Sequence, residues 1–366
     1  MADSRHTKLA KVLVHYALAL KPGDKFLIST TPAAESLLRE VVREAARAGA
    51  FITPRIALPG IQEIVLREST EEMLTQVQEI ERYEIGYFDA FLAIQASSNT
   101  KAMSGIDPQR LAKVGAARAE IQQTFMSRSA SGALRWCGTL FPTQAHAQDA
   151  GMSLADYEDF VFGAGMLHLD DPVEHWREVD REQARIIEYL RQHDTIRIVA
   201  PDTDITYRVK GRTWLNASGR VNFPDGEVFT APLEDSVNGK VCFSYPAVYQ
   251  GNEVEEVRLT FEKGRVVDFE AKRGYDFLKS MLEMDAGAKS LGEVAFGLNY
   301  GIQKFTRNTL FDEKIGGTMH MALGLAYPES GGVNQSAMHW DMVCDLREGE
   351  VFADGELCYQ KGKFII

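Results

Sequence analysis

Two histidines and three carboxylates lie within about thirty residues near the end of the chain, which has only eight histidines in all. The two segments read Phe311-Asp-Glu-Lys-Ile-Gly-Gly-Thr-Met-His320 and Ser336-Ala-Met-His-Trp-Asp341. His339 and Asp341 are two positions apart, so on a β-strand they point to one face and Trp340 points to the other. A strand with this pattern presents two metal ligands together, and the cluster therefore predicts a metalloenzyme.

Each of these residues also has a purely structural explanation when it is taken alone. Asp-Gly-Glu227 and Gly-Glu293 are each compatible with an ordinary turn or loop that leads into an apolar run. Glu313 is compatible with a solvated charge, and His320, between two methionines, with a hydrogen-bonded core histidine. Taken together, however, several acids and imidazoles in one β-rich region must be paired or metal-bound if they are buried.

The types of these residues indicate which metals and which reaction to expect. Two histidines with several carboxylates and no cysteine suit Zn²⁺, Co²⁺, Mn²⁺ or Fe²⁺. More than three carboxylates exceed what one ion needs and fit two ions about 3.5–4 Å apart with a bridging carboxylate. Such a pair activates a shared water and polarises a carbonyl, so the ligand set predicts metal-assisted hydrolysis.

The elements that must position these residues fall into two predicted domains, 1–198 and 199–366. In the first, helices alternate with apolar strands, which predicts a parallel sheet with flanking helices. In the second, short strands separated by glycine turns predict a mainly antiparallel, β-rich (α+β) catalytic domain, with a hairpin at Glu262-Lys-Gly-Arg265. The expected first-domain helices are Lys8–Leu20, Ala33–Ala48, Ser69–Glu81 and Pro172–Arg191, and the strands are Lys25–Ser29, Phe51–Leu58, Ala90–Gln95 and Leu134–Leu140.

The composition is that of a globular protein, with 45% hydrophobic and 25% charged residues in a chain of 366. The net charge of −12 argues against nucleic-acid binding and against anionic membranes. The N-terminal segment is polar and no apolar run approaches the length of a membrane span, so we expect a cytoplasmic protein. The four scattered cysteines fit reduced packing residues, and the absence of G-x-G-x-x-G after a strand leaves a dinucleotide site unsupported.

Five ordered segments of the C-terminal half resemble the aminopeptidase T / aminopeptidase S family of metalloaminopeptidases. The resemblance covers roughly residues 195–366; the N-terminal half agrees only in length and α/β character. The segments are Asn222-Phe-Pro-Asp-Gly-Glu227-Val-Phe-Thr-Ala-Pro232, Leu291-Gly-Glu293-Val-Ala295, Asn308-Thr-Leu-Phe-Asp-Glu313, His320-Met-Ala-Leu-Gly-Leu-Ala-Tyr327-Pro328 and Asn334-Gln-Ser-Ala-Met-His339-Trp-Asp341.

The resemblance implies a homodimer that releases N-terminal amino acids from peptides by means of two divalent ions, Zn²⁺, Co²⁺ or Mn²⁺, and a bridging hydroxide. It also implies that Tyr327 donates a hydrogen bond to the oxyanion and that Glu293 or Glu313 moves the proton to the leaving amine. Glu293 would be the bridging ligand. The metal ligands that it implies are Glu227, Glu293, Glu313, His320, His339 and Asp341.

The chain departs from the family between Glu313 and His320, where six residues replace the usual four and Lys314 replaces the usual Asn. We expect a looser loop here, which puts the ligand role of Glu313 in question. If Lys314 points inward, it replaces a charge or binds a substrate carboxylate. Two other functions remain open: a mononuclear Fe(II) ring-cleaving dioxygenase that uses His320, His339 and Asp341, and a non-catalytic metal-binding homologue. The glutamates Glu227 and Glu293 favour the peptidase.

Overall fold

The computed structural model describes residues 3–366, and Met1 and Ala2 lie outside the described residues. The chain forms two compact units. The first ends at His175 and also takes in Gly219–Phe223, whereas the second comprises Trp176–Ser218 and Pro224–Ile366. The boundary expected at residues 198–199 remains a prediction about independently folding domains.

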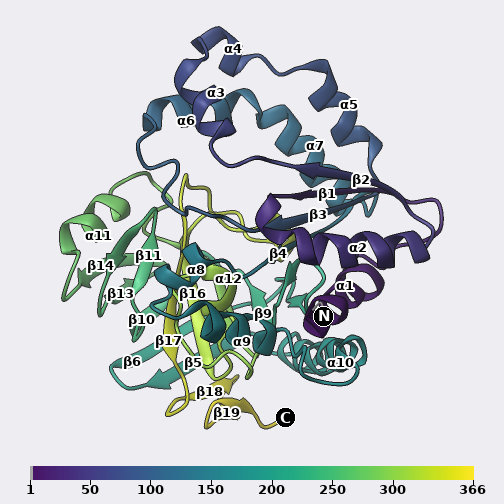
Figure 1. The fold of residues 1–366 in the computed structure, drawn as a ribbon. Coiled ribbons are helices and arrows are strands. Elements are labelled where there is room, and N and C mark those ends of the chain that lie inside the picture. The colour runs from purple at the N-terminus through teal and green to yellow at the C-terminus, as the bar shows by residue number, and fades with distance from the viewer. Residues whose placement is uncertain (1–2) are drawn as a thin grey trace. The chain divides into compact units, whose positions relative to one another are not determined.

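The first unit is built on a five-stranded parallel sheet with the strand order β2-β1-β3-β4-β8. Phe26 and Ile28 of β1 point to one face and are fully buried. Leu27 points to the opposite face, towards Phe125 of α7. Figure 1 shows α2 on one side of this sheet and α7 on the other, so the predicted α/β architecture is confirmed. The strands are β1 (Lys25–Thr30), β2 (Phe51–Ile56), β3 (Ala90–Gln95), β4 (Arg135–Leu140) and β8 (Asn222–Phe223).

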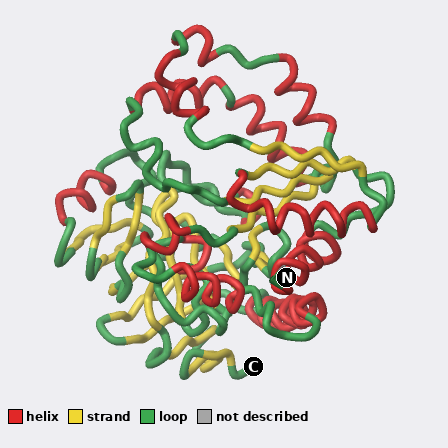
Figure 2. Tube along the Cα trace, viewed as in Figure 1, coloured by secondary structure: helices red, strands yellow, loops and turns green. Residues whose placement is uncertain are grey.

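Helices make up most of the rest of the first unit (Figure 2). One helix expected at Ser69–Glu81 is wrong, because two short helices with a break at residues 76–78 replace it. The Arg118 guanidinium donates to the Leu74 carbonyl in the last turn of the first, and Gln78 opens the second with a capping box. The helices are α1 (Ser4–Lys11), continued by a π-helix (Val12–Ala17), α2 (Glu35–Arg47), α3 (Ile61–Glu68), α4 (Glu71–Thr75), α5 (Glu79–Tyr87), α6 (Pro108–Ala117), α7 (Ala119–Ala130), α8 (Gln144–Asp149), α9 (Leu154–Ala164) and α10 (Pro172–Leu190), most of which belongs to the second unit.

The second unit contains two large antiparallel sheets and a third of only two strands, as predicted for a β-rich domain. The larger sheet has the order β14-β13-β10-β6-β5-β18-β19-β20, and Glu262 pairs with Arg265 in the predicted hairpin. Its strands are β5 (Thr195–Ala200), β6 (Thr203–Arg208), β10 (Asn238–Cys242), β13 (Arg258–Glu262), β14 (Arg265–Glu270), β18 (Glu350–Ala353), β19 (Glu356–Gln360) and β20 (Lys363–Phe364). Outside the smaller sheet, this unit also contains the two-stranded sheet of β11 (Ala247–Tyr249) and β12 (Asn252–Val254). Its remaining helices are α11 (Tyr275–Leu282), α12 (Thr309–Asp312) and a 3₁₀-helix (Pro328–Ser330).

The smaller sheet has the order β17-β16-β15-β9-β7 and two different faces. One face contributes Val294, Met321 and Trp340 to the hydrophobic core, which also contains residues of the larger sheet. Since side chains alternate along a strand, the opposite face receives the residues between them. The strands are β7 (Leu215–Ala217), β9 (Glu227–Thr230), β15 (Leu291–Gly297), β16 (Thr318–Gly324) and β17 (His339–Asp345).

Among residues 3–366, no helix combines the length and the apolar character needed to cross a lipid bilayer.

Candidate metal centre

The face of the smaller sheet away from the core carries the polar residues that the sequence singled out. His320 is paired with Ala295 of β15 and with Val343 of β17, and Asp341 is paired with Ala322 of β16. Glu293 of β15 pairs with Ala322 of β16, which follows His320 by two residues. Glu293 therefore lies diagonally opposite His320. The antiparallel register thus gathers acids and imidazoles from separate strands on one buried face.

A bulge at the start of β15 sets the position of Glu293. The pairing with β16 shifts register between Leu291 and Glu293, which leaves Gly292 outside the ladder. A Cβ atom on Gly292 would lie 2.1 Å from the carbonyl oxygen of Leu325, so only glycine fits there. The Gly that precedes this Glu in the sequence is therefore explained by close packing.

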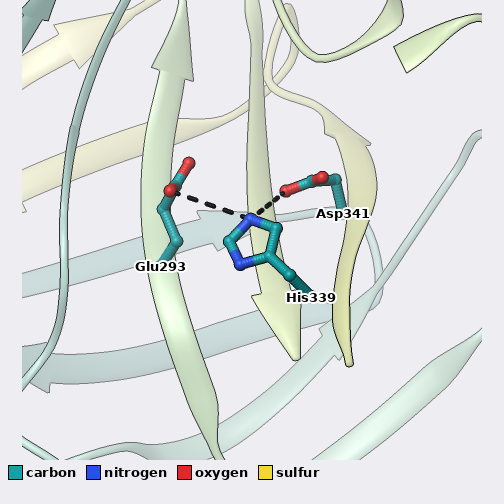
Figure 3. Close-up of side chains that lie close together, drawn as sticks. All are labelled: Glu293, His339 and Asp341. Carbon is teal, nitrogen blue, oxygen red and sulfur yellow. Dashed lines mark ion pairs between the residues drawn. The ribbon is translucent and has the colours of Figure 1, made fainter. Parts of the chain in front are cut away.

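His339 lies between two carboxylates, as Figure 3 shows. Its Nε2 atom is 3.3 Å from Oδ1 of Asp341 and 3.9 Å from Oε2 of Glu293. Both oxygens are buried and neither accepts a hydrogen bond from the described residues. The other ring nitrogen, Nδ1, lies 2.8 Å from the carbonyl oxygen of Leu325, which can only accept. Nδ1 therefore carries a proton, and Nε2 is available as a metal ligand.

His320 is held in the same way on the neighbouring strand. Its Nδ1 atom donates to the backbone carbonyl of Glu313 at 3.0 Å, and its Nε2 atom lies 2.9 Å from Oε1 of Glu293. Nε2 is also 3.8 Å from Oδ1 of Asp341. Because both imidazoles are fixed through Nδ1, both direct Nε2 towards carboxylates. This is the arrangement by which backbone acceptors orient metal-ligating histidines.

The field at this face is strongly negative. Burial lowers the pKa of both imidazoles, but nearby carboxylates outweigh it and raise the pKa of His320 to about 10 and that of His339 to about 9. Burial also raises the pKa of Glu227 well above its usual range. For Asp341, burial opposes ionisation but His339 and His320 outweigh it, which lowers the pKa to about 2. The cluster therefore needs positive charge, from protons or from a cation.

Two groups of donors are close enough to hold an ion. Glu293, His339 and Asp341 each offer one ligand atom, and these three atoms lie within 4.8 Å of one another. The same is true of Glu313, His320 and Asp341, so the two groups share Asp341. The first group fits a divalent cation, because Oε2 of Glu293 and Oδ1 of Asp341 are buried, face the imidazole nitrogen of His339 and accept no hydrogen bond from the described residues.

Lys314 is fully buried beside the second group. Its ammonium contacts the Glu313 carboxylate directly and lies 3.7 Å from Oε1 of Glu227 and 3.9 Å from Oδ1 of Asp225. Burial opposes its protonation, but these acids outweigh burial and keep the pKa of Lys314 above its usual value. Asp225 is part of this cluster although the sequence analysis did not select it. Its place in the Pro-Asp-Gly-Glu turn, two residues before Glu227, is the only sequence signal for it.

The loop before His320 is packed rather than loose, which corrects the expectation from its length. Lys314, Ile315 and Gly317 are buried. Asn299 donates its backbone N–H to Lys314 and accepts from the N–H of Gly316. A Cβ atom on Gly316 would lie 2.7 Å from the Cα atom of Tyr300, so the glycine permits close backbone contact. The packed loop therefore places the Lys314 side chain inside the site.

Tyr327 lies at the edge of the cluster. Its ring centroid is 4.8 Å from that of His339, and 39% of the residue is exposed. Burial of the hydroxyl and the nearby Glu293 carboxylate keep the pKa of Tyr327 above its usual range. The phenol therefore remains a hydrogen-bond donor at neutral pH. Each residue predicted as a ligand or catalytic group thus belongs to one connected cluster.

Comparison with known proteins finds similar sequences along nearly the whole chain. The family model described as thermophilic metalloprotease (M29) matches residues 2–364. Aminopeptidase 2 of Geobacillus stearothermophilus is 33% identical, over 95% of this chain and 94% of the relative. Aminopeptidase T of Thermus thermophilus is 28% identical, over 94% and 93%.

Two solved structures extend the comparison. Wild-type AmpT from Thermus thermophilus superposes with a TM-score of 0.84 at 25% identity and covers 99% of both chains. A 2,5-dihydroxypyridine dioxygenase from Pseudomonas putida KT2440 has a TM-score of 0.58 at 13% identity, over 98% of this chain and 96% of that one, and shares the fold alone.

Fold and sequence thus define a metal-dependent peptide hydrolase. The chain belongs to the thermophilic metalloprotease (M29) family, and the resemblance noted in the C-terminal half is confirmed over nearly its whole length. The dioxygenase alternative is not supported, because the likeness to the Pseudomonas putida dioxygenase is one of fold alone.

Proposed function

We propose that the protein is a metal-dependent aminopeptidase that removes N-terminal residues from peptides, with a divalent ion held by Glu293, His339 and Asp341. The observation that carries the proposal is the position of His339 Nε2 between two buried oxygens that accept no hydrogen bond from residues 3–366. Two of the similar proteins, from Geobacillus stearothermophilus and Thermus thermophilus, are aminopeptidases by name. Zn²⁺, Co²⁺ and Mn²⁺ all suit this set of one nitrogen and two oxygen ligands.

The chain's own residues have separate roles in the proposed reaction. A divalent ion bound here would polarise a carbonyl and lower the pKa of a bound water. Tyr327, kept protonated, donates a hydrogen bond to the oxygen of the scissile carbonyl as it becomes an oxyanion. Glu293 directs one carboxylate oxygen at His320 and the other at His339, and it moves a proton to the leaving amine.

A panel of aminoacyl anilides tests the function directly. Metal-depleted protein should be inactive and should regain hydrolysis when Zn²⁺, Co²⁺ or Mn²⁺ is added. The same substrates with an acetylated amino group should not be cleaved, because an aminopeptidase requires the free N-terminus. Failure of every ion to restore hydrolysis would favour a non-catalytic metal-binding homologue.

We further propose a cytoplasmic homodimer. Apolar side chains are exposed along the edge strand β2 and the start of α3, including Phe51 (69%), Ile56 (49%) and Ile61 (51%). An apolar edge strand is typical of an interaction surface. Light scattering should give twice the chain mass, and Phe51→Asp should shift it towards the monomer, whereas Val267→Asp on β14 should not.

Free thiols at Cys242, Cys344 and Cys358 support a reducing compartment.

A further inference from the structure

The chain carries its own cation inside the carboxylate cluster. Lys314 has no exposed surface, and its ammonium is in contact with Glu313 and near Glu227 and Asp225. Of the two roles considered for an inward lysine, replacement of a charge is the one that these contacts support, because the ammonium already faces three carboxylates of the protein.

The backbone holds this lysine in place. Ile315 forms a bridge with Asn299, and Asn299 exchanges two backbone hydrogen bonds with the loop, to Lys314 and from Gly316. Gly316 packs against Tyr300 with no space for a Cβ atom. The backbone at Lys314 is therefore fixed, and the ammonium faces the carboxylates of Glu313, Glu227 and Asp225 from inside the site.

The lysine affects the two donor groups differently. Glu293, His339 and Asp341 form no ion pair with Lys314 in the described structure. In the other group, Glu313 is bonded to the ammonium, and Glu227, which could add a ligand there, also faces it. A divalent ion on these carboxylates would have to share them with a fixed positive charge, and like charges at such distances in a buried site repel strongly.

We propose that the Lys314 ammonium takes the place of a second divalent ion, so that the chain binds one ion, at Glu293, His339 and Asp341. This inference rests on the metal-dependent function proposed above. Glu227 and Glu313 then serve as ion-pair partners of Lys314 rather than as metal ligands. The site then holds one exchangeable divalent ion and one permanent cation, the Lys314 ammonium.

The test is the metal stoichiometry of the full-length protein. Metal-depleted protein is titrated with Zn²⁺ and with Co²⁺ in a calorimeter, and the bound metal is then measured by mass spectrometry after gel filtration. We expect one ion per chain at saturation. Two ions per chain in the wild-type protein would overturn the inference, even if every variant below failed to fold.

Variants at Lys314 sharpen the result. Lys314→Met keeps the shape of the side chain but removes its charge, so it should raise the stoichiometry from one ion to two. Lys314→Arg keeps the charge and should stay at one, as should Lys279→Met, which removes a charge from exposed α11. A folded Lys314→Met protein that still binds one ion would contradict the replacement of an ion by the lysine.

Hydrolysis of aminoacyl anilides on the same preparations separates this inference from the proposed function. Hydrolysis with two bound ions would overturn only the role of Lys314. One bound ion without hydrolysis of any substrate would overturn only the aminopeptidase activity.

Discussion

Oε1 of Glu293 lies 2.9 Å from Nε2 of His320 on the neighbouring strand. The other oxygen of the same carboxylate faces His339. One glutamate therefore links both imidazoles of the cluster, and its position depends on the bulge that Gly292 allows. This relationship makes Glu293 the most sensitive residue of the site.

Glu293→Gln should abolish turnover and lower metal occupancy, because an amide is a weaker metal ligand than a carboxylate. The neutral amide also no longer offsets positive charge on the two imidazoles. We expect a loss of metal affinity of about 10- to 100-fold or more, from the usual effect of altering groups around a metal. Metal content and anilide hydrolysis are measured together. Glu350→Gln, at an exposed position of β18, is the matched control. Activity within about tenfold of wild type would refute the role of Glu293.

Tyr327→Phe should lower kcat and leave metal content unchanged. The substitution removes only the hydroxyl, so it removes the oxyanion donor while the ring contact with His339 is kept. Loss of one such donor typically costs about 100- to 1000-fold in kcat. Tyr275→Phe, at an exposed position of α11, should have no effect. An unchanged kcat in Tyr327→Phe would show that the hydroxyl has no part in stabilising the oxyanion.

Gly316→Ala should destabilise the loop that holds Lys314. The new Cβ atom would lie 2.7 Å from the Cα atom of Tyr300, closer than van der Waals contact allows, so the loop or Tyr300 must move. Overpacking of this kind costs about 1–3 kcal/mol of the free energy of unfolding, which urea denaturation can measure. Gly163→Ala in α9, where the added atom meets nothing within 4 Å, should be neutral or slightly stabilising. Equal stability of the two variants would mean that the loop is not closely packed.

Asp285→Asn should destabilise the protein at neutral pH and much less in acid. The carboxylate of Asp285 accepts hydrogen bonds from Ser336 and from the backbone N–H groups of Ala337, Gly287 and Ala288, and so ties down the segment before His339. The hydrogen bond from Ala337, followed by those from Ser336 and Gly287, outweighs burial and lowers the pKa of Asp285 below its usual value.

The sign of the pH dependence follows from this lowered pKa. The stabilisation is fully present above the unfolded pKa, about 3.9, and is lost as the pH falls through the lower folded value. Urea unfolding at pH 7 and near pH 3 should therefore show a gap between wild type and Asp285→Asn that narrows in acid. Asp268→Asn, at an exposed position of β14, is the control. A gap of equal size at both pH values would contradict the prediction.

Some features of the fold could be predicted because they depend on local pattern. The alternation of helix and apolar strand predicted the parallel sheet. The segment Glu262-Lys-Gly-Arg265 predicted the hairpin of β13 and β14 in the larger antiparallel sheet. The break between α4 and α5 was missed because it depends on Arg118, which is distant in sequence. The Arg118 guanidinium donates a hydrogen bond to the carbonyl of Leu74 in α4. Contacts of that kind leave no trace in local periodicity.

The amino-acid sequence by itself determined which side chains share a face: His339 and Asp341 alternate with Trp340, and His320 alternates with two methionines, because strand side chains repeat every two residues. Only the tertiary structure decided how those strands align, and therefore that Glu293 reaches both histidines. It also decided that Lys314 is buried. The sequence shows a lysine in a longer loop, but whether its charge faces water or carboxylates depends on the packing of that loop against Asn299 and Tyr300.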